Sequence, residues 1–125
     1  MIQHVTREIL PSEVDRSADF YGLLGFEPVP APPGIEGRAV WLERAGTQIH
    51  LMLVDEAAAS NRGLSGHVGI VVPAYEEAVA RLEAAGHAVE PRRERWGSPR
   101  GYVRDPAGYL VEIMARPPAR AGTGE

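Results

Sequence analysis

The chain has 125 residues, of which 44% are hydrophobic and 24% are charged, and its formal net charge is −4 at pH 7. This length and composition are typical of one globular domain, and the negative charge argues against nucleic acid as the main partner. The chain has no cysteine, and all 13 of its lysine-plus-arginine residues are arginine, which excludes disulfides, sulfur-ligated metals and Schiff-base catalysis by lysine.

The first half of the chain predicts a strand, a helix and three further strands. In order, these are strand 2–8, a helix from Ser12 or Glu13 to about Leu24, and strands 26–29, 38–44 and 47–54. Gly25 follows the helix as a C-cap, and Ala45-Gly46 provides the tight turn of a hairpin.

The second half predicts the same order of elements. These are strand 67–72, helix 75–85, and strands 87–91, 101–104 and 109–114. Val79 and Leu82 are expected on the apolar side of the helix, and residues 105–108 form a hairpin turn. Residues 55–65 are interpreted as a polar linker, and residues 117–125 have the Pro/Ala/Gly composition of a flexible tail.

The two halves resemble each other as copies of one unit. At an offset of 62, residues 38–52 align with residues 100–114, so that Arg38 matches Arg100. Such a repeat predicts an α+β fold of two tandem βαβββ modules, with a curved, cup-like mixed β-sheet and the helices outside. The modules are residues 2–54 and 66–115 of a single domain, 1–116.

Four side chains of metal-ligand type lie on the predicted strands: His4, His50, His67 and Glu112. The interval is 46 residues from His4 to His50 and 45 from His67 to Glu112, so the pairs occupy equivalent places in the two modules. Because side chains alternate along a strand, all four are expected on the sheet face away from the helices. Imidazole nitrogens and a carboxylate suit a divalent ion such as Zn, Ni, Co, Mn or Fe.

One histidine on a strand is usually structural or exposed, and the coincidence of four ligand-type residues is what favours a metal site. The remaining histidine, His87, follows the glycine that ends the second predicted helix. Its repeat counterpart is Phe26, which is not a ligand, and His87 is interpreted as a surface residue.

The chain resembles the vicinal oxygen chelate superfamily over roughly residues 2–115. The motifs that carry the resemblance are residues 4–6 (His-Val-Thr), 17–21 and 24–26 at the end of the first helix, 66–68 (Gly-His-Val) and 105–113 (Asp-Pro-Ala-Gly-Tyr-Leu-Val-Glu-Ile). This superfamily includes glyoxalase I, methylmalonyl-CoA epimerase, extradiol dioxygenases, fosfomycin-resistance transferases and bleomycin-resistance proteins.

The resemblance implies that the metal positions of the family correspond to His4, His50, His67 and Glu112. The second position is often Glu or Gln in the glyoxalase and epimerase branches, whereas this chain has His50. Either Glu112 or His50 is therefore the candidate catalytic base. The resemblance also implies a metal site built from two modules, which belong either to one chain or to two chains of a homodimer.

These observations favour a metal-dependent lyase or isomerase of the glyoxalase I (lactoylglutathione lyase) or epimerase type. One divalent ion would bind a small substrate through two neighbouring oxygens. The alternatives are an extradiol-type dioxygenase, a thiol transferase, or a metal-free protein that sequesters a drug. A dioxygenase normally uses two histidines and one carboxylate, and a sequestering protein has no need of four ligands.

Other features bear on the substrate and on partners. Residues 92–100 predict either a mobile rim that holds an anionic substrate or, by preference, a solvated basic loop. Trp41 and Trp96 are candidates for substrate contact, although Trp41 is mid-strand and is expected in the core. We expect a cytoplasmic protein with no membrane segment, because the chain has neither a long apolar run nor a signal-like start. Exposed sheet edges favour a homodimer.

Overall fold

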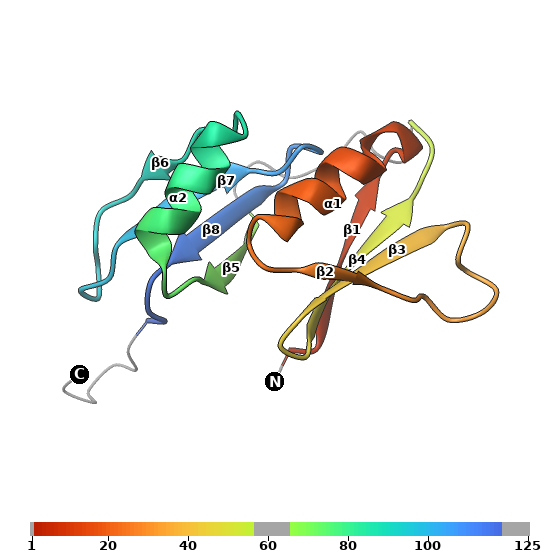
Figure 1. Cartoon of the computed structure of the whole chain (residues 1–125), viewed down its shortest axis with the longest axis horizontal. Helices are drawn as coiled ribbons and strands as arrows, with labels where there is room; N and C mark the ends of the chain where they lie inside the picture. The colour runs from red at the N-terminus through yellow and green to blue at the C-terminus, as the bar shows by residue number, and fades with distance from the viewer. Residues whose placement is uncertain (1, 57–65, 119–125) are drawn as a thin grey trace. The chain divides into compact units, whose positions relative to one another are not determined.

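The computed structural model describes residues 2–56 and 66–118, which divide into two compact units (Figure 1). Unit 1 is Met1–Gly63 with Asp105–Gly108, and unit 2 is Leu64–Arg104 with Tyr109–Glu125. Most of the predicted linker and tail lies outside the described residues. In the part of the chain that is described, no helix is long and apolar enough to cross a membrane.

Unit 1 has the predicted order of strand, helix and three strands. Its elements are β1 (His4–Ile9), the 3₁₀ turn η1 (Pro11–Glu13), α1 (Val14–Gly22), β2 (Glu27–Val29), β3 (Ala39–Arg44) and β4 (Thr47–Leu53). The sheet order is β1-β4-β3-β2, with β1 parallel to β4 and the other pairs antiparallel. The hairpin turn between β3 and β4 has positive φ at both Ala45 and Gly46, as a tight two-residue turn requires.

The core of unit 1 lies between α1 and one face of the sheet, and Figure 1 shows the helix running across that face. Leu42 and Leu51 contribute from the central strands, and Phe20 and Tyr21 contribute from α1; each of them is fully buried. The Tyr21 hydroxyl donates a 2.7 Å hydrogen bond to Asp105 Oδ2, a residue of the same unit. This pairs the only polar atom of the Tyr21 side chain, which is otherwise enclosed by apolar groups.

Unit 2 repeats the arrangement. Its elements are β5 (His67–Val71), α2 (Tyr75–Ala84), β6 (Glu90–Pro91), β7 (Arg100–Arg104) and β8 (Leu110–Met114), in the sheet order β5-β8-β7-β6. Again the first and last strands are parallel. The strand predicted over residues 87–91 is present only at its end, as β6. Its predicted start is wrong, because the His87 amide donates to the Leu82 carbonyl and Gly86 has φ +92, so these residues close the helix instead.

The core of unit 2 depends on a close contact between α2 and β7. Tyr75, Ala78 and Leu82 are buried on α2. A Cβ atom at Gly101 would lie only 2.8 Å from both the Tyr75 hydroxyl and Val89 Cγ1. Glycine at this position therefore lets the first turn of α2 lie directly on the sheet.

The strand register is the same in the two units. His4 pairs with Gln48 across β1 and β4, and His67 pairs with Leu110 across β5 and β8. In each unit the second candidate ligand, His50 or Glu112, is two residues beyond that partner. The register thus confirms that His4 matches His67 and that His50 matches Glu112.

One detail of the sequence alignment is wrong. Arg100 pairs with Met114 in unit 2, whereas Met52 in unit 1 pairs with Ala39. The counterpart of Arg100 is therefore Ala39 and not Arg38. Unit 1 has no basic side chain at the place where unit 2 has Arg100.

Candidate functional site

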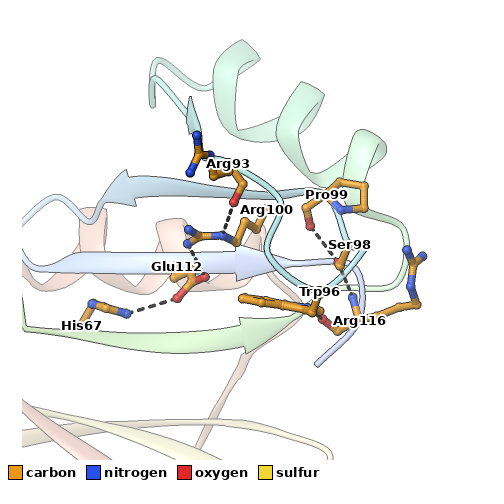
Figure 2. Close-up of polar contacts among 8 residues, drawn as sticks. All are labelled: His67, Arg93, Trp96, Ser98, Pro99, Arg100, Glu112 and Arg116. Carbon is orange, nitrogen blue, oxygen red and sulfur yellow. Dashed lines mark hydrogen bonds and ion pairs between the residues drawn. The ribbon is translucent and has the colours of Figure 1, made fainter. Parts of the chain in front are cut away.

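Unit 2 brings two of the predicted ligands together. His67 is the first residue of β5, and its Nε2 atom lies 3.1 Å from Oε1 of Glu112 in β8 (Figure 2). The Glu112 side chain is 10% exposed and that of His67 is 32% exposed. Gly69, which pairs with Glu112 across the two strands, has no side chain to compete for the space beside the carboxylate.

The second oxygen of this carboxylate is held by Arg100. Its Nη1 atom donates to Glu112 Oε2 at 2.9 Å, and its Nε atom donates to the Arg93 carbonyl at 2.9 Å. Burial lowers the pKa of Arg100, but its hydrogen bonds with Glu112 and Tyr102 outweigh this and raise the pKa above the ordinary value. The guanidinium and the carboxylate therefore form a buried ion pair.

Arg100 corrects the interpretation of residues 92–100. A solvated basic loop describes the exposed residues 92–95, but Arg100 is only 8% exposed and belongs to β7. The guanidinium carbon lies 5.4 Å from the centre of the Trp96 ring. That ring is fixed by a 2.9 Å hydrogen bond from Nε1 to the Arg116 carbonyl, and the Arg116 amide donates to Ser98 Oγ at 3.0 Å (Figure 2). The rim is thus anchored to the residues that follow β8.

In unit 1 the rings of the two predicted ligands, His4 and His50, stack with the ring of Trp41. The ring centroids of His4 and His50 are 4.2 Å apart, with planes at 15°, and those of Trp41 and His50 are 3.9 Å apart, with planes at 5°. The expectation that Trp41 lies in the core is wrong. It pairs with His50 across β3 and β4, and so it shares the sheet face opposite the buried Leu42.

Neighbouring polar groups orient the His50 ring. Its Nε2 atom is 2.7 Å from Gln48 Oε1, and Gln48 Nε2 donates to Glu43 Oε1 at 2.8 Å. Because the Gln48 amide nitrogen donates to Glu43, the Gln48 amide oxygen faces His50 and accepts a hydrogen bond from its Nε2–H group. The neutral imidazole therefore has its lone pair on Nδ1, which is the nitrogen available to a metal or a proton.

The pKa of His50 is expected to lie below the ordinary histidine value of about 6.5. Burial lowers this pKa most, and the nearby His4 imidazole lowers it further. Since the unfolded chain then binds a proton more readily, the stability contributed by neutral His50 is present above about pH 6.5 and is lost as pH falls below it. NMR titration of the metal-free protein measures this pKa.

A matched pair of variants tests the two causes of this shift. Trp41→Ala, which uncovers one face of the ring, and His4→Gln, which removes the neighbouring imidazole, should each raise the pKa of His50. A wild-type value at or above about 6.5 would contradict the placement of His50 between the two rings.

Comparison with known proteins identifies the relatives of this chain. The sequence model of the Glyoxalase/Bleomycin resistance protein/Dioxygenase superfamily matches residues 1–113. The chain belongs to this superfamily. The expected resemblance and the α+β fold of two βαβββ units are thereby confirmed.

Solved structures of this superfamily share the fold. A glyoxalase family protein from Bacillus anthracis is 25% identical, with a TM-score of 0.78 over 91% of this chain and 93% of that one. Lactoylglutathione lyase from Agrobacterium tumefaciens is also 25% identical, with a TM-score of 0.67 over 91% and 92%. A glyoxalase/dioxygenase from Nostoc punctiforme, at 18% identity, has a TM-score of 0.76 over 94% and 91%. No curated protein matches the chain.

Members of the superfamily typically bind a divalent metal, and the residues of unit 2 fit one. Two ligands at about 2.1 Å from an octahedral ion, at a right angle, are about 3.0 Å apart. The separation of 3.1 Å between His67 Nε2 and Glu112 Oε1 is close to that value. In unit 1 the lone pairs of the stacked rings lie in nearly parallel planes, so the exposed His4 ring must turn before both rings can bind one ion.

The structure thus brings together His4 with His50 in unit 1, and His67 with Glu112 in unit 2. Within either unit alone, the described residues contain no group of three histidine, aspartate or glutamate side chains that could hold a metal. The four-residue set stays a prediction. His87 is half-buried after the end of α2, and it precedes β6, which lies at the opposite edge of the unit 2 sheet from β5.

Sequence reasoning did not recognise two residues that contact the candidate ligands, Arg100 and Gln48. The signal for Arg100 was present, because alternation along β7 puts it on the face of Tyr102, which pairs with Glu112. The signal for Gln48 was its position two residues before His50 on the same strand. Both residues hold a polar atom of the second candidate ligand in their unit.

Proposed function

We propose that the protein is a metal-dependent lyase or isomerase of the glyoxalase I or epimerase type. Its substrate would be a small molecule that binds one divalent ion through two neighbouring oxygens. Superfamily membership supports the general class, and similarity to lactoylglutathione lyase from Agrobacterium tumefaciens, at 25% identity, supports the type of reaction. The ion would be held by His4, His50, His67 and Glu112.

The observation that carries this proposal is the 3.1 Å separation of His67 Nε2 and Glu112 Oε1. This is a direct N···O contact between two side chains of ligand type, at a spacing that suits adjacent positions on an octahedral ion. The equivalent register of His4 and His50 in unit 1 supplies two imidazoles. Three imidazoles and one carboxylate suit Zn, Ni, Co, Mn or Fe(II).

The chemistry can be divided between the ion and the side chains. A bound divalent ion would stabilise the negative charge that develops on the substrate oxygens as a proton leaves carbon. His50 is oriented by Gln48 with its single lone pair on Nδ1, so it is a candidate to accept that proton when this nitrogen is released from the ion. Glu112 is the other candidate, but its Oε2 atom is already engaged by Arg100.

Metal analysis and proton exchange test the proposed function. Purified protein reconstituted with each candidate ion should retain about one ion per chain. The loaded protein should then exchange a carbon-bound proton of 2-hydroxycarbonyl or 2-carboxyacyl substrates for deuterium, as seen by NMR. Absence of both retained metal and exchange across these substrates would contradict the proposal.

A second candidate is a metal-free protein that sequesters a planar ligand. The stack of Trp41, His50 and His4 favours it, because aromatic rings bind planar ligands through their faces. Fluorescence titration of Trp41 with planar aromatic ligands in the presence of a chelator distinguishes the two functions. Tight binding that is independent of metal would support sequestration.

We also propose that the protein is a homodimer. The sheet of unit 1 ends at β1 and β2 and that of unit 2 ends at β5 and β6, and sheet edges are frequent sites of pairing between chains. Sedimentation equilibrium at micromolar concentration should give twice the 13.5 kDa mass of one chain. A single species with the mass of one chain would refute this expectation.

A further inference from the structure

The Arg100–Glu112 pair has no counterpart in unit 1. At the place equivalent to Arg100, unit 1 has Ala39, and at the place equivalent to Glu112 it has His50. The basic side chain therefore occurs in the unit whose second candidate ligand is a carboxylate. This correspondence indicates that Arg100 is present to bind that carboxylate, because the fold that the two units share forms without an arginine at the equivalent place in unit 1.

The guanidinium is itself firmly held. Its Nε atom donates to the Arg93 carbonyl, and it lies against the Trp96 and Tyr102 rings, with centroid distances of 5.4 Å and 5.8 Å. Tyr102 also has Arg92 over its ring at 4.9 Å. A planar group fixed by a hydrogen bond and by ring contacts can orient a carboxylate more strictly than a flexible ammonium can.

We infer that Arg100 is a positioning residue that holds Glu112 as a fixed ligand through one oxygen. Oε2 is occupied by the guanidinium, and Oε1 is left facing His67 Nε2 (Figure 2). Glu112 cannot swing away as a mobile base without breaking a buried ion pair. This inference rests on the proposed function.

Affinity for Co(II), measured by competition with a chromophoric chelator, tests the inference without any enzymatic assay. Arg100→Gln should weaken Co(II) binding about 10-fold to 100-fold, as expected when the partner of a metal ligand is lost. Arg100→Lys, which keeps the charge but not the planar fork, should also weaken it. Arg104→Gln removes an exposed arginine from the other end of the same strand and should leave the affinity unchanged.

Chemical rescue separates positioning from a general effect on folding. Ethylguanidinium added to Arg100→Ala should restore Co(II) affinity toward the wild-type value, whereas ethylammonium should not. If Arg100→Gln melts at a lower temperature but binds Co(II) like wild type, or binds it more tightly, the inference is overturned while the proposed metal function stands. If wild-type protein does not bind Co(II), both fail. If Arg100→Gln does not fold, Arg100→Lys and the rescue experiment decide.

Discussion

Replacement of His67 by alanine is expected to abolish binding of the divalent ion. The side chain would no longer supply the imidazole nitrogen that lies 3.1 Å from Glu112 Oε1, and a carboxylate alone in unit 2 would not fix the ion. We expect the affinity to fall by more than about 100-fold, together with any lyase or isomerase activity. Equilibrium dialysis followed by elemental analysis measures the loss.

Thermal stability provides a second measure of the same loss. An ion present at about 100 times its dissociation constant stabilises the wild-type fold by about 2.7 kcal/mol, and this gain should vanish in His67→Ala. The matched control is His87→Ala, which removes a histidine outside the predicted set and should keep both metal content and the stability gain. Unchanged metal content and stability in His67→Ala would mean that the site lies elsewhere, and sequestration would become the better interpretation.

Replacement of Glu112 by alanine is expected to destabilise the protein even when a chelator is present. The variant leaves the guanidinium of Arg100 buried without its carboxylate partner, and Arg100 is only 8% exposed. Breaking a buried ion pair by removal of one partner typically costs about 3–5 kcal/mol in the free energy of unfolding. Urea denaturation, monitored by circular dichroism, provides the measurement.

A double-mutant cycle isolates the contribution of the pair. Arg100→Met, Glu112→Ala and the double variant should show a clearly non-additive loss, with the double variant more stable than the sum of the single losses predicts. Additive losses would show that the two side chains do not depend on one another.

The repeated fold was predictable from this sequence because its signals are local. Gly46 and Gly108 lie in the turns after strands whose side chains alternate between two faces. Both glycines have positive φ, as the predicted hairpin turns required. The alternation that put Leu51 in the core also put His50 on the opposite face. The ends of the strands were harder to predict from the sequence. The backbone hydrogen bond from the His87 amide to the Leu82 carbonyl, for example, makes His87 part of the end of α2, although its sequence resembles a strand.

The surroundings of the candidate ligands were less predictable. The alignment at a constant offset matched Arg100 with Arg38, one residue away from its structural counterpart Ala39. An error of one residue assigns a side chain to the wrong face of a strand, because side chains alternate between the two faces. Once Arg100 was grouped with its basic neighbours, its burial could not be inferred, because burial of an arginine depends on a carboxylate from another strand. Trp41 was assigned to the core because it lies mid-strand, although its place opposite His50 follows from pairing of β3 with β4.

The shared register also constrains how the two halves of such a chain can diverge. Ala39 and His50 occupy the places that Arg100 and Glu112 occupy in the other half. A single Ala39→Arg or His50→Glu change would leave one unneutralised charge in a buried position, whereas both together could recreate the ion pair. After duplication of an ancestral half, a change between the neutral pair and the charged pair therefore passes through an intermediate sequence with one unpaired buried charge, which is unfavourable. Such pairs are expected to be inherited jointly, and their covariation across homologues would be a record of that history.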